Sequence, residues 1–201
     1  RDRYQKLKKN MGISENSNAA IDMASGEYIM LSDHDDVVTR DALFEIVKAI
    51  NKNRDADIIY TDEDKVTMDG KDYFDPSFKP DYNIDFLRSS NYICHIFTVK
   101  RSLLEEAGKF RHEYDGAQDF DLILRCCEKA KKIIHIPKIL YHWRSHPNST
   151  AGKPESKMYA FEAGKKALEA HYARLDIKAK VELTPLFGRY RTIYEVTGHP
   201  K

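Results

Sequence analysis

Apolar segments with the features of strands alternate with helical segments in the first third of the chain, and this order constrains the fold more than any other feature. Residues 14–26 and 39–51 are predicted helices, and residues 27–32 and 56–64 are predicted strands. Both strands run directly into acidic residues. Helix–strand–helix–strand order predicts an α/β fold in which helices cover a sheet.

Cap residues and apolar spacing support the two helices. Ser14 and Thr39 are candidate N-caps, and Gly26 would end the first helix. The second helix repeats apolar residues with the i, i+3, i+4 spacing of a buried face, at Ala42, Leu43, Ile46, Val47 and Ile50.

The later part of the chain is predicted to continue the same architecture. We expect a long structured loop at 72–91 with a short helix near 83–88, a strand at 92–100, helices at 101–108 and 117–130, and two strands separated near Pro137. The pattern of short alternating elements ends near residue 151. Beyond it we expect a long helix at 154–175 and a strand at 189–196. We therefore predict two units, residues 1–151 and residues 152–201.

Composition excludes some classes of protein. The chain has 33 Lys plus Arg and 32 Asp plus Glu, so it lacks the basic excess expected of a nucleic-acid partner. No apolar stretch is long enough to predict a membrane span, and no secretory leader opens the sequence. Cys94, Cys126 and Cys127 are odd in number, which favours reduced thiols in a cytoplasmic protein.

The acids after the first strand predict a divalent metal site. In an extended segment Asp33 and Asp35 lie on the same side, where two carboxylates repel unless a cation joins them. Mg²⁺ and Mn²⁺ accept such oxygen ligands, often with substrate phosphates completing the shell. The alternative is a solvated acidic turn that caps the next helix. An EF-hand loop is excluded, because Val38 and Phe44 stand where it needs Gly and Glu.

Three separated motifs resemble those of the family 2 glycosyltransferases. They are GISENSNAAIDMASGEYIMLSDHDD at 12–36, DGAQDFDLILR at 115–125 and IPKILYHWRSHPNSTA at 136–151. The likeness covers residues 7–175 and points to the bacterial branch that builds cell-surface polysaccharides, including rhamnosyltransferase-like enzymes. It implies a GT-A-like (Rossmann-like) mixed sheet flanked by helices, with a helix and strand extension at the C-terminal end.

The resemblance implies roles for single residues. Asp33 and Asp35 match the DxD motif that holds the metal and the donor diphosphate, with Asp36 adjacent. Asp119 matches the position of the catalytic base, where Gln118 stands in place of the usual Glu. The local alternative is that Asp119 stabilises a helix N-terminus, a role that Asp121 would fill equally.

Further residues are implied near the donor and the metal. The late motif places His142 or His146 at the metal, and the sequence does not choose between them. Arg144 would neutralise phosphate charge, and Asn18 lies in a region that is near the nucleotide in family members.

On the acceptor side the expectations are weaker. Asp62 and Asp64 are interpreted mainly as part of a solvated loop. His95 and Gln118 are further candidates for contact with the acceptor.

The function implied is the inverting transfer of a sugar from a UDP- or dTDP-sugar to a saccharide or lipid-linked saccharide, with Mn²⁺ or Mg²⁺. Two alternatives remain open: a scaffold that binds metal or acceptor without turnover, and a haloacid-dehalogenase-like phosphatase. The expected location is the cytoplasm, at the inner face of the membrane.

One departure from the family matters. Members normally open with an apolar strand and turn that hold the nucleotide base and ribose, and no such segment precedes residue 14. We therefore expect an N-terminally truncated piece of a longer polypeptide. Made alone, it should fold at least partly, transfer no sugar and self-associate through an exposed sheet edge.

Overall fold

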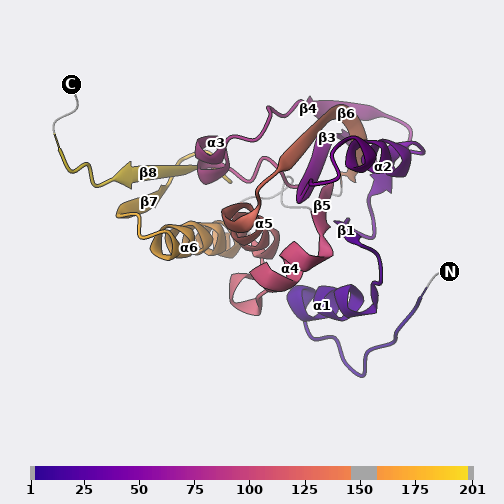
Figure 1. The fold of residues 1–201 in the computed structure, drawn as a ribbon, viewed down its shortest axis with the longest axis horizontal. Helices are drawn as coiled ribbons and strands as arrows, with labels where there is room; N and C mark the ends of the chain where they lie inside the picture. Colours follow the sequence, from indigo (N-terminus) through magenta and orange to yellow (C-terminus); the bar gives the residue numbers. More distant parts are fainter. Residues whose placement is uncertain (1–2, 146–157, 199–201) are drawn as a thin grey trace.

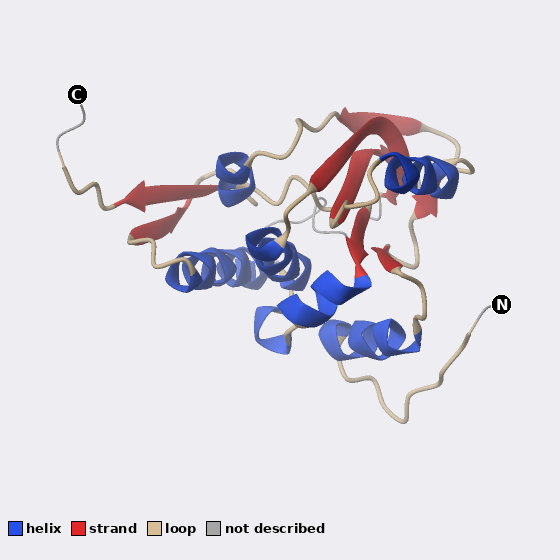
Figure 2. Cartoon of the chain, viewed as in Figure 1, coloured by secondary structure: helices blue, strands red, loops and turns tan. Residues whose placement is uncertain are grey.

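The computed structural model describes residues 3–145 and 158–198 and has an α/β fold with a mixed sheet, as predicted (Figures 1 and 2). Its strands are β1 (Tyr28–Leu31), β2 (Val37–Val38), β3 (Ile58–Val66), β4 (Tyr73–Ser77), β5 (Phe97–Lys100), β6 (Ile133–Arg144), β7 (Ala179–Leu183) and β8 (Tyr190–Tyr194). Its helices are α1 (Ile13–Met23), α2 (Ala42–Lys52), α3 (Ile84–Ser89), α4 (Arg101–Ala107), α5 (Gln118–Lys129) and α6 (Met158–Arg174), with a 3₁₀ turn η1 at His112–Tyr114.

The main sheet has the strand order β1-β5-β3-β6-β2, and β4 pairs with the outer part of β3. The β3–β6 pair is parallel, while β5 runs antiparallel to both β1 and β3. The acidic residues that follow β1 therefore lie at the same end of the sheet as the second half of β3 and β6. This arrangement brings the acids of residues 33–36 onto the end of β6.

Two apolar cores cover the two faces of the sheet because side chains alternate along each strand. Ile58 and Tyr60 face a core shared with α1, α4, α5 and α6, whereas Ile59 faces a smaller core under α2. In α2, Ala42 and Ile46 are buried, but Leu43 and Val47 of the predicted apolar face are exposed. The helix therefore buries a narrower stripe than the sequence pattern predicts.

The C-terminal elements form a helix and a separate hairpin. β7 and β8 pair only with each other in the described part of the chain, and they project away from the main sheet (Figure 2). Helix α6 lies along α5, and its residues Ala167, Leu168 and Tyr172 belong to the larger core. The predicted boundary at 151/152 lies outside the described residues and stays a prediction.

Several predicted elements require correction. The two strands expected around Pro137 are one continuous strand, β6. Its pairing with β3 passes from Ile136 to Ile139 across a bulge, so Pro137 and the residue after it take no part in the registered ladder. A bulge is a position where a sheet tolerates proline. The loop expected at 72–91 contains strand β4 besides the expected helix α3, and β7 was not predicted.

The predicted helix caps are also wrong. The N-cap positions are Gly12 for α1 and Asp41 for α2, and neither has a side-chain cap bond. Ser14 is instead buried one residue inside α1, where its hydroxyl donates to the carboxylate of Asp115. Thr39 donates to Asp41 at 2.8 Å.

Candidate active site

The acidic segment after β1 is held in place by the hydroxyl of Tyr141. This buried residue of β6 accepts a hydrogen bond from the backbone N–H of Asp33 at 3.1 Å and donates one to the carboxylate of Asp36. Burial, and then the bond to Asp36, raises the pKa of Tyr141, so the hydroxyl keeps its proton. One side chain thus fixes the acidic segment at two points.

Arg144 at the end of β6 binds the same segment through both its backbone N–H and its guanidinium group. Its N–H donates to the Asp36 carboxylate at 2.8 Å, and its Nε donates to the carbonyl of Asp35 at 2.7 Å. Its Nη1 donates to the carbonyl of Met68, between β3 and β4, at 2.9 Å. The guanidinium therefore joins the acidic segment to the β3–β4 connection.

Three potential metal ligands meet beside this segment. Oxygens of Asp33 and Asp36 and a ring nitrogen of His95 all lie within 4.8 Å of one another. His95 Nε2 is 3.9 Å from Asp33 Oδ2, and the His95 ring stacks on Tyr141 with centroids 4.8 Å apart. Burial raises the pKa of Asp36, although its hydrogen bonds oppose this shift. A cation would remove this cost of holding the carboxylate charged.

Two other predicted metal ligands, Asp35 and His142, lie outside this group of three. The side chain of Asp35 is 58% exposed, and its Oδ1 lies 4.0 Å from Nδ1 of His34. His142 Nδ1 is hydrogen-bonded to Asp64, and the ring packs against Tyr73 with centroids 4.5 Å apart. His146 lies outside the described residues. The roles of Asp35 and the two histidines therefore stay predictions.

A cavity of about 590 Å³ connects the candidate metal site with the candidate base. Asp33, Cys94, His95 and Asp119 all line it, as do apolar side chains of α1 and β1. Asp119 accepts a hydrogen bond from Asn91 Nδ2 at 2.8 Å. Burial raises the pKa of Asp119, nearby His95 opposes the shift and nearby Asp33 adds to it. Asp119 is therefore electrostatically linked to two of the candidate metal ligands.

Asp121 differs from Asp119 in every respect that matters for a base. It is fully buried, and both of its oxygens are bonded to guanidinium groups. Arg111 donates to it from Nε at 3.1 Å, and Arg125 from Nη2 at 2.8 Å. Arg125 also donates to the carbonyls of residues 107–109 at the end of α4. Through Arg125, Asp121 thus joins α5 to the end of α4, and Asp119 is the acid of α5 that lines the cavity.

Two candidate residues from the nucleotide and acceptor predictions are hydrogen-bonded to backbone groups. Asn18 donates to the Phe110 carbonyl and accepts from the Phe110 N–H, both at 2.9 Å, so its amide is occupied. Its neighbours Asn16 and Ser17 line the cavity. Gln118 also lines the cavity, while its Oε1 accepts from the N–H of Gly116 at 2.8 Å.

The second acidic cluster is not the solvated loop that the sequence suggested. Asp62 and Asp64 lie within β3 and are 3% and 8% exposed. Asp62 binds His135 Nε2 at 2.8 Å, and Asp64 binds His142. The parallel pairing of β3 with β6 places each acid beside a histidine, a long-range contact that no local pattern reveals.

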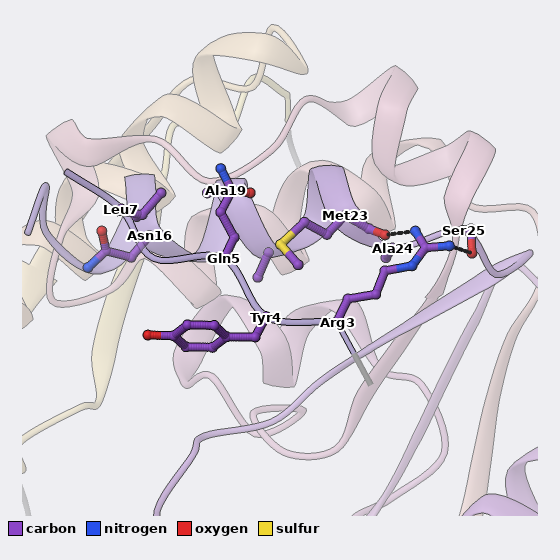
Figure 3. A pocket seen from close by; sticks show the side chains of 10 residues that line it. Arg3, Tyr4, Gln5, Leu7, Asn16, Ala19, Met23, Ala24 and Ser25 are labelled. Atoms are coloured by element: carbon purple, nitrogen blue, oxygen red, sulfur yellow. Dashed lines mark hydrogen bonds between the residues drawn. The ribbon is translucent and has the colours of Figure 1, made fainter. Parts of the chain in front are cut away.

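A second cavity of about 420 Å³ lies between the N-terminal segment and α1 (Figure 3). Arg3 closes one end of it through bonds to the Met23 carbonyl at 2.6 Å and to Ser25 Oγ. The remaining lining is apolar or uncharged, and no carboxylate is present among the described lining residues. Of the three candidate metal ligands, Asp33 and His95 line the first cavity, and none lines the second.

The comparison with protein families decides the classification. Residues 3–108 match the family model described as glycosyl transferase family 2. The chain belongs to glycosyl transferase family 2. The matched region contains the candidate metal ligands of the family 2 chain, whereas Asp119 follows it in the sequence.

Two relatives match nearly the whole family 2 chain. It is 46% identical over 191 residues to protein y4gI of Sinorhizobium fredii, covering 94% of this chain and 21% of that protein. It is 36% identical over 176 residues to the O-antigen biosynthesis protein RfbC of Myxococcus xanthus, covering 88% of this chain and 14% of that protein. The chain therefore spans about a fifth or less of the length of these relatives.

Solved structures share the fold. TarS of S. aureus in complex with UDP-GlcNAc aligns with a TM-score of 0.58 at 16% identity, over 84% of this chain and 56% of that chain. A mannosyltransferase of Pyrobaculum calidifontis in complex with GDP-Man and Mn²⁺ aligns with a TM-score of 0.51 at 18% identity, over 84% and 45%. These glycosyltransferases show that the family 2 chain has a GT-A fold. Within residues 3–145 and 158–198, no helix is both long and apolar enough to cross a membrane.

Tyr141, Asn91 and Cys94 are residues of the site whose roles the sequence did not indicate. Tyr141 has the spacing of a core strand residue, and it is one, but its hydroxyl also binds the acidic segment. From an irregular loop before β5, Cys94 lines the cavity and Asn91 donates a hydrogen bond to Asp119. The only indication in the sequence was the segment NYICH at 91–95, which places the polar residues Asn91 and His95 ahead of an apolar strand.

Proposed function

We propose that this chain is the part of a glycosyltransferase that binds the donor diphosphate and activates the acceptor. The observation that carries the proposal is one cavity lined by Asp33 and His95 of a metal-type cluster and by a separate carboxylate, Asp119. Membership of family 2 supports the reaction class. The likeness to the O-antigen biosynthesis protein RfbC supports synthesis of a cell-surface polysaccharide.

The metal is proposed to be Mn²⁺ or Mg²⁺, held by Asp33, Asp36 and His95. Carboxylate oxygens suit both ions, but a ring nitrogen among the ligands favours Mn²⁺, because Mg²⁺ prefers oxygen alone. The bound cation would neutralise the charge that develops on the leaving diphosphate. Tyr141 and Arg144 hold Asp36 in place for this role.

Asp119 is the proposed general base. Inverting transfer needs one base beside the acceptor hydroxyl, and Asp119 lies on the cavity wall apart from the candidate metal ligands, with no ion pair to a cationic side chain in the described part of the chain. Asn91 would fix its orientation by donating to one oxygen and leaving the other for the acceptor proton. Asp121 cannot take this role, because two arginines occupy its carboxylate.

The proposed donor is a UDP- or dTDP-sugar, and the proposed acceptor is a saccharide or a lipid-linked saccharide. The shared fold with TarS, which was solved in complex with UDP-GlcNAc, supports a nucleotide-sugar donor. The apolar side chains of α1 and β1 that line the cavity offer a surface for the less polar parts of a ligand.

Titration with Mn²⁺ tests the metal site on which the proposal depends. Asp33→Asn should weaken Mn²⁺ binding at least tenfold, because it removes the charge of a ligand, while Asp35→Asn should have a smaller effect. Electron paramagnetic resonance of free Mn²⁺ gives both affinities. Equal affinities of wild type and Asp33→Asn would overturn the assignment of the site.

A further inference from the structure

Residues 91–96 bring several side chains to the cavity although they form neither a helix nor a strand. Asn91 binds Asp119, and Cys94 and His95 line the cavity wall. Cys94 has a φ of 37°, in the left-handed region that side chains other than glycine rarely adopt. Such a backbone persists only where surrounding contacts determine it. The question is which contacts hold this loop.

The buried ammonium of Lys79 supplies these contacts. Its side chain is 1% exposed, and Nζ donates to the carbonyl of Ile93 at 2.8 Å and to that of His95 at 2.6 Å. The third donor goes to the carboxylate of Glu63 at 3.1 Å. An ammonium has three donors, so Lys79 is fully satisfied, and two of its three bonds go to the loop.

Both Lys79 and Glu63 are anchored to the central strand β3. Glu63 belongs to β3, and its carboxylate also accepts from the backbone N–H of His95 at 3.3 Å. The backbone N–H of Lys79 donates to Asp62, the neighbouring strand residue, at 2.9 Å. The backbone of His95 is therefore bound at its N–H and at its carbonyl by one buried ion pair.

This anchoring determines where the His95 ring lies. With its backbone fixed, the ring stacks on Tyr141 and places Nε2 3.9 Å from Asp33 Oδ2. A shift of the loop would move the His95 ring nitrogen away from the carboxylates of Asp33 and Asp36, although all three residues would still be present. Loss of a contact that orients a metal ligand without touching the metal typically lowers metal affinity by about 10-fold to 100-fold.

We propose that Lys79, paired with Glu63, is the positioning residue that sets His95 at the divalent-cation site. The inference rests on the proposed function, since it assumes that Asp33, Asp36 and His95 bind the cation. It adds a residue that touches neither the cation nor the sugar. It also gives the buried ion pair a purpose, because such a pair contributes little net stability compared with apolar residues of the same volume.

The sign of the effect separates positioning from simple electrostatics. Removing a positive charge near a cation site strengthens cation binding by Coulomb's law. Removing the residue that holds a ligand weakens it. Lys79→Met should therefore weaken Mn²⁺ binding about 10-fold to 100-fold if Lys79 acts through His95.

The experiment measures Mn²⁺ affinity in a set of variants, with thermal melting to confirm that each is folded. Lys79→Met leaves the Glu63 carboxylate without its cationic partner, so the double variant Lys79→Met/Glu63→Gln, which replaces the ion pair by two neutral side chains, is made as well. Lys65→Met is the matched control, because Lys65 pairs with Asp75 and does not bond to residues 91–96. We expect weaker Mn²⁺ binding in the Lys79 variants and no weakening in the control.

A cycle with His95→Gln completes the test. If Lys79 acts only through His95, adding Lys79→Met to His95→Gln gives little further loss of affinity. Full additivity, or unchanged or tighter Mn²⁺ binding in a folded Lys79 variant, would overturn the positioning role. If Asp33→Asn and His95→Gln themselves leave Mn²⁺ binding unchanged, the metal site of the proposed function fails instead.

Discussion

At the scale of single residues, the acids in and around the site differ in the groups that bind their carboxylates. Asp121 is paired with two guanidinium groups, Asp62 and Asp64 are each hydrogen-bonded to a histidine, and Asp36 is hydrogen-bonded to Tyr141 and a backbone N–H. Asp119 has one neutral side-chain donor, Asn91. A carboxylate with a single amide partner on a cavity wall remains available to accept a proton.

In the full-length protein, Asp119→Asn tests the base directly. The amide keeps the size of the side chain and removes the proton acceptor, so transfer should fall about 10²–10⁴-fold while metal-dependent donor binding is retained. Transfer is measured with a labelled nucleotide sugar, and donor binding by calorimetry. Turnover within a few-fold of wild type would place the base elsewhere.

Asp121→Asn is the contrasting variant on the same helix. It leaves Arg111 and Arg125 without their buried partner, so it should lower the free energy of unfolding by about 3–5 kcal/mol. Chemical denaturation measures this loss. A stable Asp121→Asn protein that had lost only transfer would reverse the roles assigned to the two acids.

Tyr141→Phe tests the residue that holds the acidic segment. The ring stays in the core, but the Asp33 N–H and the Asp36 carboxylate lose their shared partner, so Mn²⁺ affinity should fall about 10-fold or more. Tyr60→Phe is the control, since that buried hydroxyl donates to the carbonyl of Pro80, away from the acids. Equal Mn²⁺ affinities for the two variants would show that the Tyr141 hydroxyl does not position the site.

At the scale of elements, the hairpin β7–β8 depends on a close approach to α6. A Cβ added at Gly164 of α6 would collide with the hydroxyl oxygen of Tyr190 in β8 and lie 2.8 Å from the ring carbon that bears it. Both approaches are closer than real Cβ contacts. Glycine at this helical position therefore makes room for the tyrosine ring.

Gly164→Ala should consequently destabilise the protein, although glycine to alanine inside a helix ordinarily stabilises by about 0.5–1 kcal/mol. The expected loss is about 1–3 kcal/mol, the usual cost of overpacking. Adding Tyr190→Phe removes the nearer of the two clashing atoms and should restore part of the stability, as measured by denaturation. An unaltered or more stable Gly164→Ala protein would show that the hairpin does not pack as described.

The elements also show how far the sequence could predict the structure. Helix α5 and the apolar strand β1 were predictable, because their periodicity is local and strong. Strand β4 and the burial of Asp62 and Asp64 were not, because both depend on pairing between distant segments. In β3, Asp62 and Asp64 are hydrogen-bonded to histidines that lie 73 and 78 positions away in the sequence. The pattern of acids alone looks the same in a solvated loop.

The candidate site was predictable to a similar degree. The acids at 33–36 and Asp119 stand out as motifs, and the structure places them at one cavity or beside it. Asp35 was expected as a ligand because extended geometry places it on the same side as Asp33, and this stays a prediction. In the structure residues 34–36 turn into β2, and the acid that groups with Asp33 and His95 is Asp36. The sequence did not predict that His95 lies beside Asp33 and Asp36, because that position depends on how Lys79 binds the loop at 91–96.

At the scale of the whole molecule, helices α3, α5 and α6 are joined by one buried polar cluster. Glu128 binds His171 Nδ1 at 2.7 Å and Arg174 Nη2 at 2.6 Å, and Arg88 donates to the other nitrogen of His171 at 3.2 Å. Burial alone would raise the pKa of Glu128, but the bonds from His171 and Arg174 outweigh it and hold the pKa below its ordinary value.

This cluster predicts a pH-dependent loss of stability. Because the folded pKa of Glu128 is lowered, its contribution is complete above the unfolded value of about 4.3 and is lost as the pH falls through the folded value. Glu128→Gln should therefore destabilise the protein at pH 7 by about 1–3 kcal/mol, with a smaller difference below about pH 4. Denaturation at both pH values measures this. Glu106→Gln, in an exposed pair with Lys129, should show almost no effect at either pH.

The most direct test of the account is whether the cavity binds a nucleoside diphosphate through a divalent cation. Calorimetric titration with UDP and dTDP, with Mn²⁺ and after its removal by chelation, compares wild type with Asp33→Asn. We predict that one or both nucleotides bind only with Mn²⁺ present, and that Asp33→Asn removes this binding. Binding that persists without the metal, or that is unchanged in Asp33→Asn, would contradict the claim that these acids form a metal-dependent donor site.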